Sequence, residues 1–458
     1  MLLYYLDFSL YIRSVVREFK RTNAPSLAII GERGMPAFQT VRGMRDLIGD
    51  EAKTFTNIIK NARETASLYG YKEVITPLVE PLELLSAKSG DEIRQRMFIF
   101  KDLGGRNVAL RPEFTASIAR LATTYLKNEP KPLRLFSVGT VYRYDEPQRG
   151  RYREFWQSNF ELMGSAKAEA DVEIVLLTNS LMKSFGLQGF AFKIGHIGVI
   201  RSILCQDGVD EKTQNSILQR MDKKEFDAAL KLVKPEKCRA MLGGLLEIRG
   251  NDWLDSIEQI EKYVVDYPKA KVAVENLSKV LKLVAESTSA SITVDPAFAR
   301  GLEYYTGIIF EVYIPGLDIA LGGGGRYDRL IESFGGESTS AVGCAHGIDR
   351  VAIALQIQRA SLVAKKERRV VVIPITEALK ARALKIAQQL RSAKVTVEFE
   401  VMGRKMTKAM EDADKRKVDF AVIVGEREIK EGSVMVKDLA NRQQVMVPID
   451  KLVEKIKS

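Results

Sequence analysis

Two strands and a charged loop are predicted by the neighbouring stretches Phe136-Ser-Val-Gly-Thr-Val-Tyr-Arg-Tyr-Asp145 and Arg151-Tyr-Arg-Glu-Phe-Trp-Gln-Ser-Asn-Phe-Glu161. Apolar and aromatic residues alternate with polar ones over residues 133–143 and again over 154–163, which is typical of strands. The intervening residues 144–153 are charged and are expected to form the loop. The chain is therefore predicted to contain a long antiparallel hairpin.

The second strand of this hairpin has an unusually polar face. Successive side chains of a strand point to opposite faces, so Phe155, Gln157, Asn159 and Glu161 share one face. Burying an amide and a carboxylate without partners is costly, so this face is expected to line a wet pocket for a polar ligand. An exposed sheet face is the alternative.

Arginines accompany the hairpin: Arg143 ends its first strand, and Arg149, Arg151 and Arg153 follow in the loop. Guanidinium groups bind phosphate oxygens through paired hydrogen bonds. The hairpin therefore favours a phosphate-bearing ligand.

The hairpin resembles motif 2 of the class II aminoacyl-tRNA synthetases. The resemblance implies that Arg143 contacts the α-phosphate of ATP, that Arg151 reaches the outer phosphates and that Phe155 stacks on adenine. The acid two residues after the first arginine is a glutamate in that family and is Asp145 here. Its contact with the adenine amino group or the tRNA end would be made by a shorter side chain.

A second informative stretch is Asp295-Pro-Ala-Phe-Ala-Arg-Gly-Leu-Glu-Tyr-Tyr-Thr-Gly-Ile-Ile-Phe310, where polar residues replace the valine or isoleucine of an ordinary buried strand. A structural turn with an aromatic anchor is the alternative. Its Arg-Gly-Leu-x-Tyr-Tyr-Thr resembles a signature of histidyl-tRNA synthetases. The resemblance implies that Arg300 grips the α-phosphate and the histidine carboxylate. It also implies that Tyr305 and Glu161 bind the imidazole nitrogens, with Tyr304 beside them.

The stretch Leu110-Arg-Pro-Glu-Phe-Thr115 places an acid and a hydroxyl just after a predicted strand. Taken alone, it also fits a helix start capped by Thr115. It resembles a histidyl-tRNA synthetase motif in which the acid, here Glu113, holds the ammonium group of the amino acid. The resemblance gives Thr115 and Gln157 supporting roles.

Two further motifs lie near residue 330. Gly322-Gly-Gly-Gly-Arg-Tyr-Asp328 is either a flexible turn or the second histidine-specific motif of the family, in which Gly323, Gly324 and Gly325 form the pocket floor. Ser340-Ala-Val-Gly-Cys-Ala-His-Gly-Ile-Asp-Arg350 resembles class II motif 3, which implies that Arg350 packs over adenine and contacts the terminal phosphate. His346 stands where an apolar residue is usual and is interpreted as a packing variant.

We expect three parts in this chain. Residues 1–40 form an extension of uncertain status, with Met35 as a natural protein start and no peptide expected from residues 1–30. Residues 41–363 form an α+β class II catalytic core, an antiparallel sheet with flanking helices and a helical insertion at about 206–290. Residues 364–458 form a basic α/β domain that the resemblance identifies as anticodon-binding.

Residues 50–77 and the residues beyond 370 lead to three further structural predictions. A helix is predicted to begin at the N-cap Asp50 and end at Gly70, followed by a strand over residues 71–77. This order resembles class II motif 1, which implies a homodimer. Strands and helices alternate beyond residue 370, which favours a largely parallel sheet.

Charge and composition narrow the class of protein. There are 70 lysine and arginine against 59 aspartate and glutamate residues, and residues 365–458 hold 22 basic against 14 acidic ones. A basic C-terminal domain favours a polyanionic partner, with a solvated, salt-bridged surface as the alternative. Three scattered cysteines and two histidines argue against a zinc site or disulfides and fit the cytoplasm. No stretch has the length and hydropathy of a membrane span, and the N-terminus lacks the pattern of a signal peptide.

The resemblance as a whole implies a histidine–tRNA ligase. Such an enzyme activates L-histidine with ATP to histidyl-adenylate and transfers it to the 3′ end of tRNA(His). Mg²⁺ would be bound mainly through the ATP phosphates, with no side-chain metal site predicted. The alternatives are a synthetase-like regulatory subunit of ATP phosphoribosyltransferase, which usually lacks the arginine motif and the C-terminal domain, and a noncatalytic RNA sensor.

Overall fold

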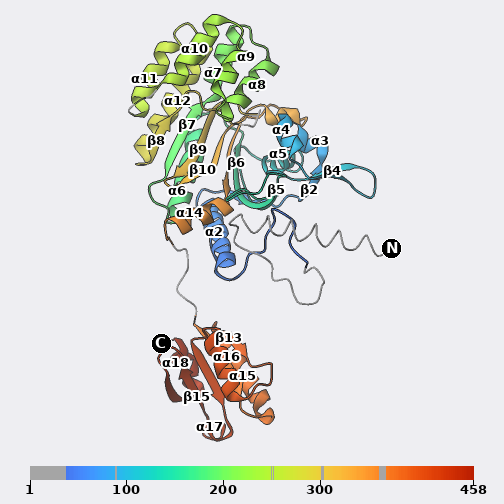
Figure 1. The fold of residues 1–458 in the computed structure, drawn as a ribbon, viewed down its shortest axis with the longest axis vertical. Helices are drawn as coiled ribbons and strands as arrows, with labels where there is room; N and C mark the ends of the chain where they lie inside the picture. The colour runs from blue at the N-terminus through green and yellow to red at the C-terminus, as the bar shows by residue number, and fades with distance from the viewer. Residues whose placement is uncertain are drawn as a thin grey trace, which may run out of the picture. The chain divides into compact units, whose positions relative to one another are not determined.

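The computed structural model describes residues 38–87, 90–248, 250, 252–300, 304–360 and 368–457. Nearly all of the expected N-terminal extension lies outside these ranges. The chain divides into two compact units, and the second consists mainly of the residues from Arg359 onward (Figure 1). The two units are described separately below. Among the described residues, no helix has both the length and the apolar character needed to cross a membrane.

An eight-stranded sheet forms the centre of the first unit. In hydrogen-bonded order its strands are β1 (Lys72–Glu73), β5 (Leu133–Tyr142), β6 (Glu154–Met163), β11 (Ala341–Gly347), β10 (Leu317–Arg326), β9 (Ile308–Ile314), β7 (Ala191–His196) and β8 (Ser291–Val294). The pairs at the two ends, β1 with β5 and β7 with β8, are parallel, and the strands between them are antiparallel. The predicted antiparallel sheet is confirmed.

The predicted hairpin is the longest pairing of this sheet. β5 and β6 are in register from Leu133 opposite Met163 to Tyr142 opposite Glu154. β6 pairs on its other side with β11, and β5 pairs with the short end strand β1 at Leu135 and Phe136, so the hairpin lies between other strands of the sheet. Three helices accompany the sheet, α2 (Gly49–Leu68), α6 (Ala168–Ser184) and α14 (Ile348–Ile357).

The start of the first unit differs in detail from its prediction. The N-cap of α2 is Ile48, which has no capping side chain, so Asp50 lies inside the first turn. Its negative charge is still favourable at a helix N-terminus. The predicted strand over residues 71–77 pairs only as the short β1, after which the chain continues without a strand.

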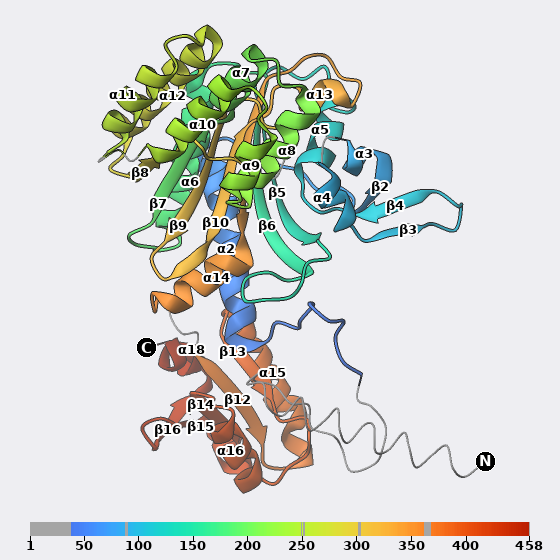
Figure 2. The same ribbon diagram turned by 45° about the horizontal axis from the view of Figure 1, so that its top comes forward.

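Two smaller groups of elements flank the sheet. One is the three-stranded sheet β2-β4-β3 with its adjacent helices: β2 (Val79–Pro81), α3 (Leu82–Ser86), α4 (Gly90–Gln95), β3 (Ile99–Lys101), β4 (Asn107–Leu110), α5 (Thr115–Thr123) and α13 (Leu330–Ser333). The other is a group of helices: α7 (Ile197–Gln206), α8 (Glu211–Asp222), α9 (Phe226–Leu232), α10 (Glu236–Glu247), α11 (Trp253–Tyr263) and α12 (Pro268–Ser287). Figure 2 shows this second group gathered at one end of the large sheet.

The second unit has a five-stranded mixed sheet. Its strands in order are β13 (Thr396–Phe399), β12 (Arg369–Pro374), β14 (Phe420–Val424), β15 (Ser433–Asp438) and β16 (Gln443–Pro448). The helical elements are η1 (Glu377–Leu379), α15 (Lys380–Ser392), α16 (Met406–Lys415), α17 (Glu426–Lys430), η2 (Ile449–Lys451) and α18 (Leu452–Lys457). β12 pairs in parallel with β13 and β14, whereas β15 and β16 add an antiparallel hairpin. The prediction of a largely parallel sheet is wrong for this hairpin, because it follows β14 directly and needs no helical crossover.

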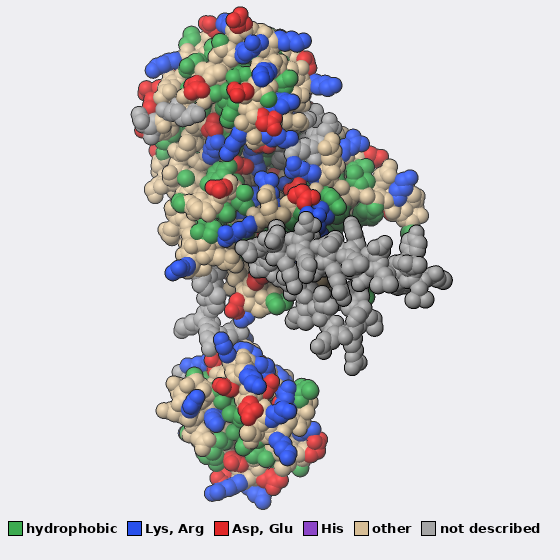
Figure 3. All heavy atoms as spheres, in the orientation of Figure 1, with side chains coloured by type: hydrophobic (Ala, Val, Ile, Leu, Met, Phe, Trp, Pro, Cys, Tyr) green, Lys and Arg blue, Asp and Glu red, His purple; other side chains and the backbone are tan. Residues whose placement is uncertain are grey.

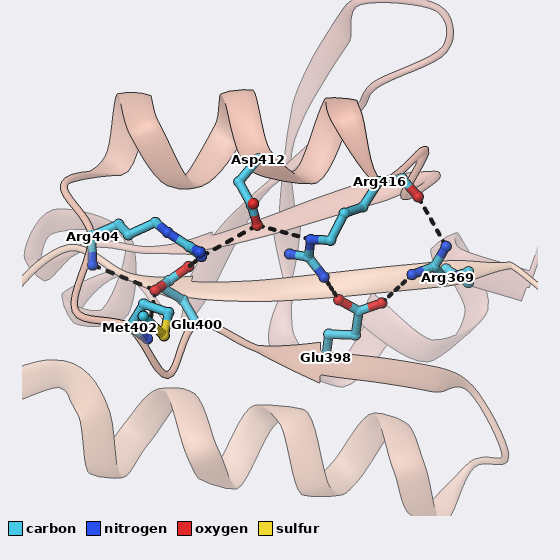
Figure 4. A network of polar contacts seen from close by, with 7 residues as sticks. All are labelled: Arg369, Glu398, Glu400, Met402, Arg404, Asp412 and Arg416. Atoms are coloured by element: carbon cyan, nitrogen blue, oxygen red, sulfur yellow. Dashed lines mark hydrogen bonds and ion pairs between the residues drawn. The ribbon is translucent and has the colours of Figure 1, made fainter. Parts of the chain in front are cut away.

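Acidic side chains offset much of the positive charge of the second unit. Figure 3 shows basic and acidic side chains interspersed on the face of this unit that is drawn. A chain of ion pairs runs along one side of its sheet (Figure 4). We call it the ionic ladder; its members are Arg369, Glu398, Arg416, Asp412, Arg404 and Glu400. The arginines of the ladder are therefore committed to neighbouring carboxylates.

Candidate active site

A pocket opens against the central strands of the first unit and draws its lining from segments far apart in the sequence. The predicted site residues that line it are Glu113, Thr115, Arg143, Phe155, Gln157, Arg300, Tyr304, Tyr305, Gly323 and Arg350. They come from β6, β10, the residue just after β5, the start of α5, the loop before β9 and the first turn of α14. Five separate sequence motifs thus meet at one cavity.

The polar face of β6 lines this pocket, as the alternation predicted. Phe155, Gln157 and Asn159 lie in the lining, so the alternative of an exposed sheet face is wrong. Gln157 is 9% exposed, and its Oε1 has no hydrogen-bond partner among the residues that the structure describes. An unsatisfied buried amide oxygen is costly unless a ligand supplies a donor.

Glu161 lies deepest on this face and is held by three donors. Its Oε1 accepts hydrogen bonds from Thr115 Oγ1 at 2.7 Å and Asn159 Nδ2 at 2.6 Å, and its Oε2 accepts one from the hydroxyl of Tyr327. Burial raises the pKa of Glu161 to about 7, although these hydrogen bonds oppose the rise. Gly343 on β11 leaves the space for this carboxylate, because a Cβ there would lie 1.7 Å from Glu161 Oε2. The group is thus positioned to titrate near neutral pH.

Glu113 caps the helix that follows it. Its carboxylate accepts hydrogen bonds from the backbone N–H groups of Thr115 at 2.6 Å and Ala116 at 3.0 Å, in the first turn of α5. The cap that the sequence allowed for Thr115 is therefore made by Glu113, while the Thr115 hydroxyl is directed to Glu161. Both residues lie in the pocket lining, where Glu113 presents a negative charge.

Two pocket arginines bond only to carbonyl oxygens. Arg143 Nε donates to Pro112 O at 2.9 Å, and Arg350 Nη1 donates to Ala320 O at 2.8 Å. Within the described part of the chain, neither has a carboxylate in ion-pair range. Burial, followed by repulsion from Arg143 and Arg151, lowers the pKa of Arg350 to about 10. Cations gathered in this way favour an anionic ligand.

Arg300 is held across the pocket by an acid and a phenol. Its Nε lies 3.5 Å from Glu311 Oε1, and its Nη1 donates to the Tyr305 hydroxyl at 3.3 Å. The ring centroids of Tyr304 and Tyr305 lie 4.9 Å apart. Burial raises the pKa of both phenols, so they remain protonated hydrogen-bond donors at neutral pH.

Several predicted residues lie outside the lining. Glu161 is one of them, although it accepts hydrogen bonds from the lining residues Thr115, Asn159 and Tyr327. Arg151 is exposed on the loop, and Asp145 forms an ion pair with Arg96 Nη1 at 3.3 Å. The glycine run is part of β10, so the alternative of a flexible turn is wrong. A Cβ on Gly325 would lie 2.9 Å from the Tyr305 ring, whereas one on Gly324 would point to β11.

Tyr327 and Glu311 line the pocket without an assignment from the sequence, whereas Asn159 was predicted to lie on the pocket face without a stated role. Asn159 and Tyr327 donate to Glu161, and Glu311 holds Arg300. The alternation of β6 placed Asn159 on the face of Gln157 but did not indicate its hydrogen bond to Glu161. Tyr327 and Glu311 carry weaker signals, because their roles depend on pairings between distant segments.

Neither histidine of the chain lines the pocket. His346 is buried, and its Nε2 lies 3.1 Å from Thr178 Oγ1 of α6. His196 Nδ1 accepts a hydrogen bond from the backbone of Gly198 at 3.1 Å. Burial lowers the pKa of His346 to about 3 and that of His196 to about 4. Both imidazoles are therefore neutral structural groups.

Comparisons with known proteins agree with this geometry. A family model described as histidyl-tRNA synthetase matches residues 43–351, and one described as an anticodon binding domain matches residues 369–458. The histidine–tRNA ligase of Methanocaldococcus jannaschii is 39% identical and covers 91% of this chain and 98% of its own length. That of Sulfolobus acidocaldarius is 37% identical, with coverage of 91% and 98%.

Solved structures resemble both units of the chain. The histidyl-tRNA synthetase of S. aureus in its apo form has a TM-score of 0.70 at 25% identity, covering 92% of this chain and 100% of that one. A Bacillus halodurans protein described as an ATP phosphoribosyltransferase regulatory subunit/histidyl-tRNA synthetase has a TM-score of 0.71 at 28% identity, covering 82% and 97%. On the sequence relatives and both matched families, the chain belongs to the histidyl-tRNA synthetases.

Proposed function

We propose that this chain is an ATP-dependent histidine–tRNA ligase, which forms histidyl-adenylate in the pocket and transfers the histidyl group to tRNA(His). The observation that carries the proposal is one cavity lined by the buried carboxylate Glu113 and by three arginines, with a second buried carboxylate, Glu161, hydrogen-bonded to the lining residue Thr115. The carboxylates suit the ammonium and imidazole groups of histidine, and the arginines suit the phosphates of a nucleotide.

Histidine binding is assigned to the β6 side of the pocket. Glu113 holds the ammonium group with Gln157, whose unpartnered Oε1 is a ready acceptor. Glu161 accepts from one imidazole nitrogen, and Tyr305 contacts the other. A pocket built to pair with both ring nitrogens discriminates strongly against aliphatic side chains, since its buried polar groups would then be left unpaired.

Adenylate formation is an in-line attack of the histidine carboxylate on the α-phosphorus, with pyrophosphate leaving. Because two anions approach each other, positioning and charge neutralisation dominate the catalysis. Arg143 and Arg300 are proposed to grip the α-phosphate from two sides, and Arg350 to pack over adenine. The exposed Arg151 would reach the outer phosphates. The adenylate's own phosphate oxygen is a suitable base for the transfer step.

Mg²⁺ is proposed to arrive with ATP and to neutralise charge on its outer phosphates. Glu311, the carboxylate beside Arg300, fits an outer contact to such an ion. A homodimer in the cytoplasm is proposed as the working form. Apolar side chains on α2 and just after β1 support the dimer, since Leu68 is 86% and Ile75 93% exposed.

ATP–pyrophosphate exchange with each of the twenty amino acids tests the proposal. We expect exchange with histidine alone. The regulatory-subunit alternative predicts no exchange with any amino acid, while an RNA sensor would bind tRNA without exchange.

A further inference from the structure

The loop between β5 and β6 is held from outside by a short segment that precedes α2. The backbone N–H of Arg153 donates to Gly43 O at 2.8 Å. The guanidinium carbon of Arg45 lies 3.8 Å from the ring centroid of Tyr152. Gly43 is required for this approach, because its φ is +85° and a Cβ would lie 2.7 Å from Arg153 Cγ. Two successive residues of the loop are thus fixed by the segment that contains Arg45.

Arg45 also reaches the first turn of α14 on the other side of the pocket. Its Nη2 lies 2.8 Å from Asp349 Oδ1, while Asp349 Oδ2 accepts a hydrogen bond from the backbone N–H of Trp156 at 2.8 Å. The Asp349 side chain is 5% exposed and that of Arg45 is 27% exposed. One carboxylate therefore joins the segment before α2, the start of β6 and the residue next to Arg350.

We propose that Arg45 is a positioning residue for ATP: it fixes Phe155 and Arg350 relative to each other through Tyr152 and Asp349. The inference rests on the proposed function, because it assumes that Phe155 and Arg350 bind the adenine ring between them. Phe155 directly precedes Trp156, whose N–H is bonded to Asp349, and Arg350 directly follows Asp349. Arg45 itself is not part of the pocket lining.

The electrostatics of Asp349 explain why an arginine is needed. Burial raises the pKa of this carboxyl, and the rise is opposed first by the hydrogen bond from Trp156 N–H and then by the charges of Arg45 and Arg350. Without Arg45, the buried carboxylate would lose its cation and either take up a proton or move toward water. Either change disturbs the hydrogen bond to Trp156 and the first turn of α14.

Arg45→Gln tests the proposal in the full chain, by ATP–pyrophosphate exchange with the two substrates varied in turn. We expect the KM for ATP to rise on the order of tenfold, as for the loss of one charge-assisted contact, with the KM for histidine changed less than about twofold. Arg42→Ala is the matched control, because its pair with Glu146 at 2.8 Å is exposed on both sides and makes no link to Asp349. We expect that control to match the wild type.

Two further variants separate positioning from general stability. Arg45→Lys keeps the charge but not the planar group over Tyr152, so its KM for ATP should lie between those of the wild type and Arg45→Gln. Asp349→Asn keeps an acceptor for Trp156 N–H, so combining it with Arg45→Gln should cost less than the two single effects together.

The outcomes are distinct. If the wild-type protein shows no histidine-dependent ATP–pyrophosphate exchange, the proposed function is wrong. If the wild type is active, the inference is overturned when Arg45→Gln behaves as Arg42→Ala does. It is also overturned when both KM values rise equally, when Arg45→Lys is no better than Arg45→Gln, or when the two mutations at positions 45 and 349 are additive.

Discussion

Individual side chains in the pocket are fixed by their neighbours before any ligand contacts them. Glu161 has three donors, Glu113 has two backbone N–H groups, and Arg300 lies between Glu311 and Tyr305. Groups held in this way need little reorganisation when charge develops in a transition state. The neighbours of these side chains thus hold them in position before the reaction begins, so little free energy is lost in ordering them during catalysis.

Arg300 gives a direct prediction. Arg300→Ala should lower histidine-dependent ATP–pyrophosphate exchange on the order of 10², the scale lost with one transition-state donor. Arg220→Ala, which removes an ion pair with Glu225 on the helical insertion, serves as the control and should leave exchange unchanged. Exchange close to the wild-type rate in Arg300→Ala would remove this residue from the mechanism.

The protonation of Glu161 gives a second prediction. Since its pKa is about 7, lowering the pH through neutrality protonates the carboxylate, removes the acceptor for an imidazole N–H and should raise the KM for histidine. The Tyr327 hydrogen bond lowers this pKa, so in Tyr327→Phe the rise should begin at a higher pH.

Exchange kinetics between pH 6 and 8 measure the difference between the two proteins. The free histidine titrates identically in both experiments. The displacement between the two profiles of KM for histidine against pH therefore measures the change in the pKa of Glu161. Profiles that coincide, or a displacement to lower pH, would contradict the assignment.

At the scale of elements, the ionic ladder joins β12, β13 and α16 of the second unit. Arg404 Nη1 lies 3.2 Å from both Glu400 Oε2 and Asp412 Oδ2, and Arg416 Nε lies 2.8 Å from Asp412 Oδ2 (Figure 4). Glu400 is 5% exposed and also accepts the backbone N–H of Met402 at 2.8 Å. This carboxylate therefore stabilises the turn that begins α16.

Glu400→Ala should destabilise the second unit by about 2 kcal/mol, because it removes the buried carboxylate that accepts from Met402 N–H and pairs with Arg404. Hydrogen exchange of peptides from β13 and α16, measured in the full chain, should become faster. Glu377→Ala is the control: its pair with Lys380 is exposed, so little change is expected. Equal exchange in the two variants would show that the ladder adds no stability.

A strand or helix could be predicted from the sequence where its apolar residues repeat with one regular period. The period of two in β6 gave both the strand and its pocket face, because that pattern depends only on neighbouring residues. The hairpin of β15 and β16 was missed, although the turn after Asp438 contains Asn441 and Arg442. Only Val447 of β16 is buried, so this strand has no clear apolar pattern, and the preceding alternation favoured a parallel sheet.

The site was predictable to the extent that short motifs carry it. Glu113, Gln157 and Arg300 stand in recognisable motifs and line the pocket. Tyr327 was missed because its contact with Glu161 joins residues far apart in the chain. Asp145 was assigned from its place in a motif, whereas the position of Arg96 decides where its carboxylate points.

At the scale of the whole molecule, each unit has a hydrophobic core of its own. In the second unit, α15 and α18 pack on one face of the sheet around Val372 and Val424, while α16 packs on the other around Val371. The pocket residues all belong to the first unit, from Glu113 to Arg350. The pocket thus lies in the first unit, whereas the match to the anticodon binding family lies in the second.

Deleting residues 365–458 should therefore weaken aminoacylation far more than adenylation. The pocket keeps its residues, whereas the tRNA loses the contacts of the basic unit. Exchange and tRNA charging measured on the same preparation give the comparison. An equal loss of both activities would argue that the second unit serves only the stability of the first.

The burial of His196 and His346 has a practical consequence. With pKa values of about 4 and 3, neither ring gains or loses a proton in the interval where free histidine does. The two imidazole signals of the protein therefore do not shift with pH in that interval. In a nuclear magnetic resonance titration near neutral pH, the ring resonances of a bound histidine would therefore move against two imidazole signals that stay in place.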